Sequence, residues 1–184
     1  AIRHAQAITV ISQSDRDLLL NFGATCPVEV MPVSLDIKLI PPEPAGKDSF
    51  QLLAVGRMIA KKGFDIAIQC LQFLPDTYTL TLIGEGELKT DWQQLSHSLG
   101  LEKRIRWLGF QPLTETLHSL HQSFCLLHPA RIAPDGNAEG HPQMILWAQA
   151  MRIPVIATPT GQISEIVQEN QTGLLVPSEH PEAL

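Results

Sequence analysis

The sequence has 184 residues, of which 44% are hydrophobic, so it can supply one domain with a substantial core and a short piece of another. Its formal net charge of −6 gives no general attraction for nucleic acid, so we expect no DNA or RNA partner. The three cysteines are far apart and form no CxxC pair, which indicates reduced, mostly buried thiols in a cytoplasmic protein. No apolar run approaches the roughly 20 residues that span a bilayer, and no signal peptide is visible.

The first 40 residues predict a small strand–helix–strand unit. Residues 7–12 read as a short buried strand, and Ser14 or Asp15 is expected to cap a helix that runs to Phe22. A second strand is expected at 28–31. The chain starts with Ala1 and not with Met, so we expect it to be part of a longer gene product, with residues 1–40 as the tail of an N-terminal domain and the interdomain segment.

A Pro-rich, polar stretch follows at 41–49 and reads as a linker. From residue 50 onward, short strands alternate with helices. The strands are expected at 50–55, 79–83, 105–108, 124–127, 155–157 and 174–176, and the helices at 64–74, 87–99, 114–121, 142–151, 163–168 and from 179 onward. This alternation predicts an α/β domain at 50–184, a doubly wound, Rossmann-like parallel sheet of about six strands. Ligands of such sheets bind beyond the carboxyl ends of the strands, so the loops there carry the functional information.

The loop after the first of these strands runs from Gly56 to Gly63 and contains Arg57 and Lys62. Two cations beside the first N–H groups of a helix make a site for phosphate. The alternative interpretation is a solvated, charged loop.

The next two loops are less specific. Gly84-Glu85-Gly86 resembles the start of a dinucleotide fingerprint, but Lys89 stands where the third glycine is required. Since no acidic residue ends the next strand either, we disfavour a nicotinamide-dependent oxidoreductase. Phe110 follows the third strand and either forms a wall for a base or packs in the core.

The loop at 128–141 is long and polar, and such a loop at the end of a central strand is seldom filler. It ends in Glu139-Gly140-His141, and Pro142 suits the first turn of the following helix. Glu139 would accept hydrogen bonds from hydroxyl groups. After the fifth strand, Thr160 is expected to cap the short helix, and the pair His118 and His121 reads as exposed helix histidines, not as a metal site.

Six segments of the sequence, in matching order and spacing, resemble retaining glycosyltransferases of the GT-B fold, group 1 type. They are Ala54-Val55-Gly56-Arg57 followed by Lys62-Gly63, Leu82-Ile83-Gly84-Glu85-Gly86, Leu108-Gly109-Phe110, Asp135-Gly136 followed by Glu139-Gly140-His141-Pro142, Pro154-Val155-Ile156-Ala157-Thr158, and Gly173-Leu174-Leu175-Val176. The likeness runs across nearly the whole chain, and its N-terminal part resembles the segment that joins the two domains of that family.

The resemblance implies a role for each matching residue. Arg57 and Lys62 would bind the diphosphate of the donor and stabilise its charge, and Glu139 would contact the donor sugar, which makes these three the catalytic candidates. The remaining donor-binding candidates are Gly56, Glu85, Phe110, Gly140, His141, Pro142 and Gln143. No metal and no further cofactor are implied.

Three positions depart from the family pattern. Trp147 stands where the family has a second glutamate that binds the ribose, and tryptophan has no acceptor to offer. Gln162 and Ser164 replace a glycine and a proline. Two functions therefore stay open, a hexosyltransferase seen as its donor-binding half and a non-catalytic nucleotide-sugar-binding or scaffold module.

The expected partners are a UDP-, GDP- or ADP-sugar donor, a carbohydrate or lipid-linked acceptor, and a missing N-terminal domain of the same protein. A cytoplasmic location is expected, with peripheral association at the inner face of the membrane as the alternative for the full-length protein. The fragment alone is expected to transfer nothing.

Overall fold

The computed structural model describes residues 4–44, 46 and 50–184 and divides the chain after Leu35 into two compact units. Residues 45 and 47–49 of the expected linker lie outside the described residues, as does the start of the chain. Residues 41–44 form no helix or strand, in keeping with their prolines.

The first unit is a single strand–helix–strand element. Strands β1 (Ile8–Val10) and β2 (Val28–Val30) pair in parallel and are joined by helix α1 (Gln13–Asn21). The cap of α1 is Ser12, whose hydroxyl accepts a hydrogen bond from the Asp15 amide at 3.1 Å, so the expectation of a cap at Ser14 or Asp15 was wrong. The expected burial of the first strand was also wrong, because two strands and one helix offer nothing to cover both of its faces.

The second unit contains the main sheet. Its elements are η2 (Ile37–Leu39), β3 (Gln51–Val55), η3 (Ala60–Lys62), α2 (Phe64–Cys70), η4 (Leu71–Phe73), β4 (Thr79–Ile83), α3 (Lys89–Ser98), η5 (Glu102–Arg104), β5 (Ile105–Gly109), α4 (Leu113–Gln122), β6 (Cys125–His128), α5 (Gln143–Ala150), β7 (Val155–Ala157), α6 (Ile163–Ile166) and β8 (Leu174–Leu175), where η marks a 3₁₀-helix.

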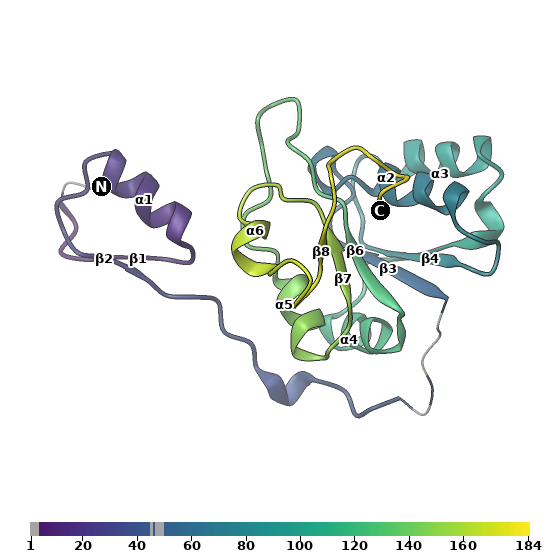
Figure 1. The fold of residues 1–184 in the computed structure, drawn as a ribbon, viewed down its shortest axis with the longest axis horizontal. Coiled ribbons are helices and arrows are strands. Elements are labelled where there is room, and N and C mark those ends of the chain that lie inside the picture. The colour runs from purple at the N-terminus through teal and green to yellow at the C-terminus, as the bar shows by residue number, and fades with distance from the viewer. Residues whose placement is uncertain (1–3, 45, 47–49) are drawn as a thin grey trace. The chain divides into compact units, whose positions relative to one another are not determined.

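The sheet is parallel throughout and has the strand order β5-β4-β3-β6-β7-β8. Helices α2 and α3 lie on one side of it and α4 and α5 on the other (Figure 1). The predicted doubly wound parallel sheet is therefore confirmed. The order reverses between β3 and β6, since the chain winds outward in opposite directions from these two strands. At such a switch point the loops beyond the strand ends diverge and leave a crevice.

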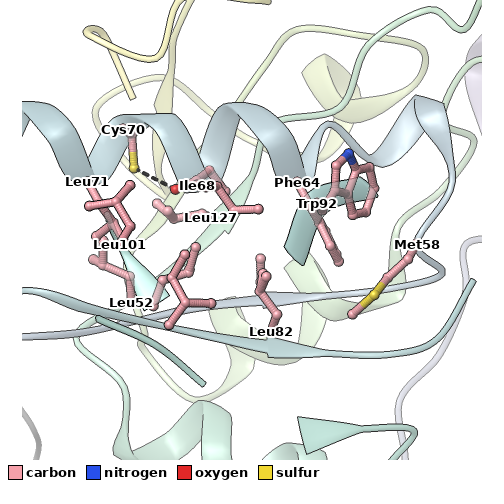
Figure 2. Packing of buried hydrophobic residues seen from close by; sticks show 14 of the residues in the cluster. Leu52, Met58, Phe64, Ile68, Cys70, Leu71, Leu82, Trp92, Leu101 and Leu127 are labelled. Carbon is pink, nitrogen blue, oxygen red and sulfur yellow. Dashed lines mark hydrogen bonds between the residues drawn. The ribbon is translucent and has the colours of Figure 1, made fainter. Parts of the chain in front are cut away.

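The core between α2, α3 and the sheet contains every second residue of the strands, because the side chains of a strand alternate between the two faces of a sheet. Leu52 and Leu82 lie beneath α2 and contact its inward side chains (Figure 2). The rings of Phe64 and Trp92 join α2 to α3, with their centroids 5.4 Å apart. Met58 is fully buried in the same cluster, although it belongs to the loop after β3, so this loop is anchored to the core.

Some helix ends differ from the sequence-based expectation. Helix α2 ends at Cys70 and continues only as the 3₁₀ turn η4, and α4 begins behind Pro112, so Thr114 is not its cap. No helix starts at Glu179, because its φ of 63° is left-handed and Pro181 disfavours helical geometry in the residue before it.

Candidate functional site

The loops after β3 and β6 meet at the switch point of the sheet. Lys62, at the end of η3, places its Nζ 2.5 Å from Oε2 of Glu139, which lies on the β6–α5 loop. Both side chains are mostly buried, with 13% and 9% of their surface exposed. The structure thus brings together two of the three residues that the sequence singles out for catalysis, 77 positions apart in the chain.

A cavity of about 380 Å³ lies beside this ion pair, at the carboxyl ends of β3, β4 and β5. It is lined by Val55, Gly56, Arg57, Ile83, Gly84, Glu85, Phe110, Gln111 and Thr116. Gly56 connects the cavity to the ion pair, since a Cβ on this glycine would lie 2.9 Å from Cε of Lys62. The lysine stem therefore passes directly over the backbone of the cavity wall.

Arg57 lines the cavity and is exposed, and its guanidinium has no hydrogen-bond or ion-pair partner among the residues that the structure describes. Glu85 also lines the cavity, and its carboxylate is held by Lys89 at 2.7 Å. Phe110 is 77% exposed, so the interpretation as a core residue was wrong. Arg57, Glu85 and Phe110 thus surround one hollow beside the Lys62–Glu139 pair.

The loops after β3 and β4 pack closely, which gives the two glycines of the Gly84-Glu85-Gly86 segment a structural reason. A Cβ on Gly84 would lie 1.8 Å from the carbonyl oxygen of Gly56. The backbone of Met58 exchanges hydrogen bonds with the same segment, since its N–H donates to the Glu85 carbonyl at 2.8 Å and its carbonyl accepts from Leu88 at 3.0 Å. No side chain therefore fits at position 84, where the two loops approach most closely.

The charge state of Glu139 is set by its neighbours. Burial by itself raises the pKa of a carboxyl group, but the His128 ring and the Lys62 ammonium outweigh that effect and hold the pKa of Glu139 at about 2. His128 ends β6 and places Nε2 3.3 Å from Oε2 of Glu139. Burial lowers the pKa of His128, and the nearby Glu139 opposes this only in part. At neutral pH the site therefore holds a carboxylate beside a neutral imidazole.

The β6–α5 loop is held by contacts from several elements. Nζ of Lys61 donates to the Ala138 carbonyl at 3.1 Å and to Oδ1 of Asn137 at 3.3 Å. Arg131 forms an ion pair with Asp65 of α2, and the Arg131 amide donates to the Lys61 carbonyl at 2.9 Å. This scaffold fixes Glu139 against the start of α2.

On the other side, the β7–α6 loop supports the same segment. The Thr160 hydroxyl donates to the Ala130 carbonyl at 3.1 Å, so this threonine does not cap α6 as expected. The amide of Gln162 donates to the Glu139 carbonyl at 3.3 Å. The β6–α5 loop is therefore hydrogen-bonded to the β7–α6 loop through a side chain and through the backbone.

The start of α5 presents backbone donors beside Glu139. Pro142 is the residue before the helix and not part of its first turn, and Gln143 is the first helical residue. Within the described part of the chain, the amides of Gly140, His141 and Gln143 have no acceptor. Unpaired N–H groups at a helix start attract anions and hydroxyl oxygens.

Sequence reasoning missed His128, which it treated only as the first residue of a loop, and Lys61, which it considered only as part of a basic pair. The signal for His128 was a polar residue at the end of an apolar strand. His121, expected to be exposed, is only 4% exposed. In the described ranges, no group of three or more His, Cys, Asp or Glu side chains could hold a metal ion.

The sequence is similar to those of known glycosyltransferases. Residues 37–184 match the family model described as glycosyl transferases group 1. The amylovoran biosynthesis glycosyltransferase AmsK of Erwinia amylovora is 30% identical over 137 residues, which cover 73% of this chain and 34% of AmsK. A GDP-mannose-dependent alpha-(1-6)-phosphatidylinositol monomannoside mannosyltransferase of Mycobacterium tuberculosis is 26% identical over 186 residues, covering 92% of this chain and 48% of that protein. The chain thus spans less than half the length of either relative.

Among solved structures, the chain is similar to Anabaena Alr3699/HepE, crystallised in complex with UDP. The TM-score is 0.83 at 23% identity, and the match covers 97% of this chain and 52% of that chain. This likeness concerns the fold. Among the residues that the structure describes, no helix has both the length and the apolar character needed to cross a membrane.

Proposed function

The chain belongs to the group 1 glycosyl transferases, and from this premise we propose that it is the donor-binding half of a longer, retaining hexosyltransferase. The observation that carries the proposal is the contact between Lys62 and Glu139 across the switch point, beside a cavity that Arg57 lines. Because the chain spans 34% and 48% of two full-length relatives, the acceptor-binding domain is assigned to the rest of the protein.

Arg57 and Lys62 bind the diphosphate of the donor. In the reaction, the bond between the sugar's anomeric carbon and the diphosphate oxygen breaks, a bond to an acceptor hydroxyl forms, and the hydroxyl proton is released. Negative charge then grows on the leaving diphosphate, and Arg57, Lys62 and the amides at the start of α5 stabilise it. The amides at the start of α5 are fixed in the backbone, so they do not have to reorganise during the reaction.

Glu139 binds the donor sugar. Its carboxylate stays ionised at neutral pH because its pKa is about 2, so it accepts hydrogen bonds from sugar hydroxyls and does not donate them. The nucleoside occupies the 380 Å³ cavity, with Phe110 against the base. Among the described residues that line the cavity, Glu85 alone carries a carboxylate, so the ribose hydroxyls are assigned to it in place of the glutamate that Trp147 replaces.

Calorimetry with UDP, GDP and ADP on this chain tests the proposal. We expect at least one of them to bind, and we expect Arg57→Ala to weaken that binding about tenfold or more, the loss typical of a charged hydrogen bond. Lys103→Ala is the matched control, because Lys103 is an exposed cation of η5 outside the cavity lining. Equal affinities of the wild type and Arg57→Ala would refute the assignment of the diphosphate site.

Trp147 favours a second candidate, a module that binds a nucleotide sugar without transferring it. This residue is 3% exposed on α5 and has no acceptor atom for a ribose. The full-length protein decides between the two functions. Hexose transfer to any acceptor supports the enzyme, whereas tight donor binding without turnover supports the module. Transfer by the 184-residue chain alone would contradict the proposed division of labour between two domains.

A further inference from the structure

His128 is a buried polar residue to which the proposed function gives no task. It is 2% exposed, and in the described part of the chain its Nε2 has no hydrogen-bond partner. Oε2 of Glu139 lies 3.3 Å away, close enough for the ring to help lower the pKa of Glu139, but the two groups are not aligned for a full hydrogen bond. Buried polar atoms are nearly always paired, so this one needs an explanation.

The oxygen that His128 faces is already occupied, since Lys62 contacts the same Oε2 at 2.5 Å. In the proposed function, the Lys62 ammonium has to leave Glu139 and bind the diphosphate of the donor. Its stem already lies over Gly56 at the cavity wall, so the ammonium starts from a position beside the cavity. Glu139, 9% exposed, would then keep only the more distant Lys61, 3.9 Å from Oε1, and a buried carboxylate without a hydrogen-bond donor is strongly unfavourable.

We propose that His128 takes over Oε2 of Glu139 when Lys62 turns to the donor, and we call this exchange the Glu139 handover. His128 is thus a positioning residue, and the inference rests on the proposed function for the fate of Lys62. While His128 holds Oε2, Oε1 remains available to a sugar hydroxyl. Oε1 has Lys61 as a more distant neighbour at 3.9 Å.

The position of His128 suits this task. It sits in β6, a central strand, opposite Ala157 of β7. Its carbonyl accepts from the amides of Ala130 at 2.9 Å and Thr158 at 3.3 Å, so the base of its side chain is fixed while Glu139 lies on a loop. Beside a carboxylate, a neutral imidazole carries its proton on Nε2, because the bare nitrogen would set two lone pairs against each other. A small rotation of the carboxylate completes the hydrogen bond.

The first test needs no ligand. Thermal unfolding is measured for Lys62→Met, His128→Leu and the double variant. In Lys62→Met the carboxylate can still turn to His128, so we expect the double variant to lose about 5 °C more than the sum of the single losses. Strict additivity would overturn the partnership. Lys103→Met combined with His128→Leu is the control pair and should be additive, and His128→Gln should recover most of the extra loss because its amide still donates.

The second test measures binding of UDP, GDP and ADP. For a nucleoside diphosphate that binds the wild type, we expect His128→Leu to lower the affinity about tenfold, and less than about twofold in a Glu139→Gln background, where a neutral amide needs no replacement donor. The same loss in both backgrounds indicates ordinary packing and overturns the handover. If the wild type binds none of the three nucleotides, the proposed function and the handover both fall, while the thermal cycle still decides whether His128 and Glu139 are partners.

Discussion

Replacing Glu139 by glutamine should remove a defined part of the acid sensitivity of the second unit. The pKa of Glu139 is about 2 in the folded protein, against an ordinary value of 4.5. A depressed carboxyl pKa stabilises the folded state above the unfolded pKa, and this contribution disappears as the pH falls toward the folded pKa. It amounts to about 3 kcal/mol at neutral pH, of which about 2 kcal/mol is lost between pH 5 and pH 3.

Urea unfolding followed by tryptophan fluorescence measures this loss. All three tryptophans (Trp92, Trp107 and Trp147) lie in the second unit, so the signal reports that unit alone. Between pH 5 and pH 3, the wild-type midpoint should fall by about 1 M urea more than the midpoint of Glu139→Gln. Burial lowers the pKa of His128, and both proteins retain this residue, so its titration contributes to both curves.

The matched control is Glu115→Gln, which removes an exposed carboxylate from α4. Its stability should follow the wild type across the same range. Parallel wild-type and Glu139→Gln profiles between pH 5 and pH 3 would refute the view that Lys62 and His128 hold Glu139 ionised in the folded state.

Two further predictions concern stability and reactivity. Gly63→Ala should lower the free energy of unfolding in urea by about 3 kcal/mol or more, because its Cβ would lie 1.9 Å from the Pro129 carbonyl oxygen at a φ of 62°. The control is Gly100→Ala, which has a φ of 68° but open space around it and should cost only about 1 kcal/mol. Equal losses in the two variants would contradict the clash. Burial raises the pKa of Cys70 and Cys125 to about 12, so iodoacetamide at pH 8 should label half-buried Cys26 in the native protein and the other two only after unfolding, as mass spectrometry would show.

The strands of the second unit were predictable because apolar runs and turn residues agree there. Residues 79–83 are followed directly by Gly84, and the predicted strand coincides with β4. Helix starts were harder, because several polar residues near one another can each cap a helix. In the first unit Ser12 and not Ser14 caps helix α1, and only the backbone geometry distinguishes the two serines.

The candidate site was predictable residue by residue but not as an arrangement. The sequence singles out Lys62 and Glu139 separately, because each lies in the connection between a strand and the α-helix that follows it. It does not show that the two side chains touch, nor that the Lys62 stem covers Gly56. The sequence did not point to His128, because only its contact with Glu139 in the folded protein marks this histidine as part of the site.

The sequence by itself determined the order of strands and helices, the parallel sheet and the loops that carry charge, since these follow from local periodicity and turn chemistry. The tertiary structure decided which charges meet. The last residues of strands β3 and β6, Val55 and His128, are 73 positions apart in the sequence, yet the two strands pair as neighbours at the switch point.

 The pairing of β3 with β6 brings Lys62, Glu139 and His128 into one buried crevice, where little water screens their charges. Their mutual distances, and with them the pKa of Glu139, depend on contacts between distant parts of the chain, which no local pattern of residues encodes.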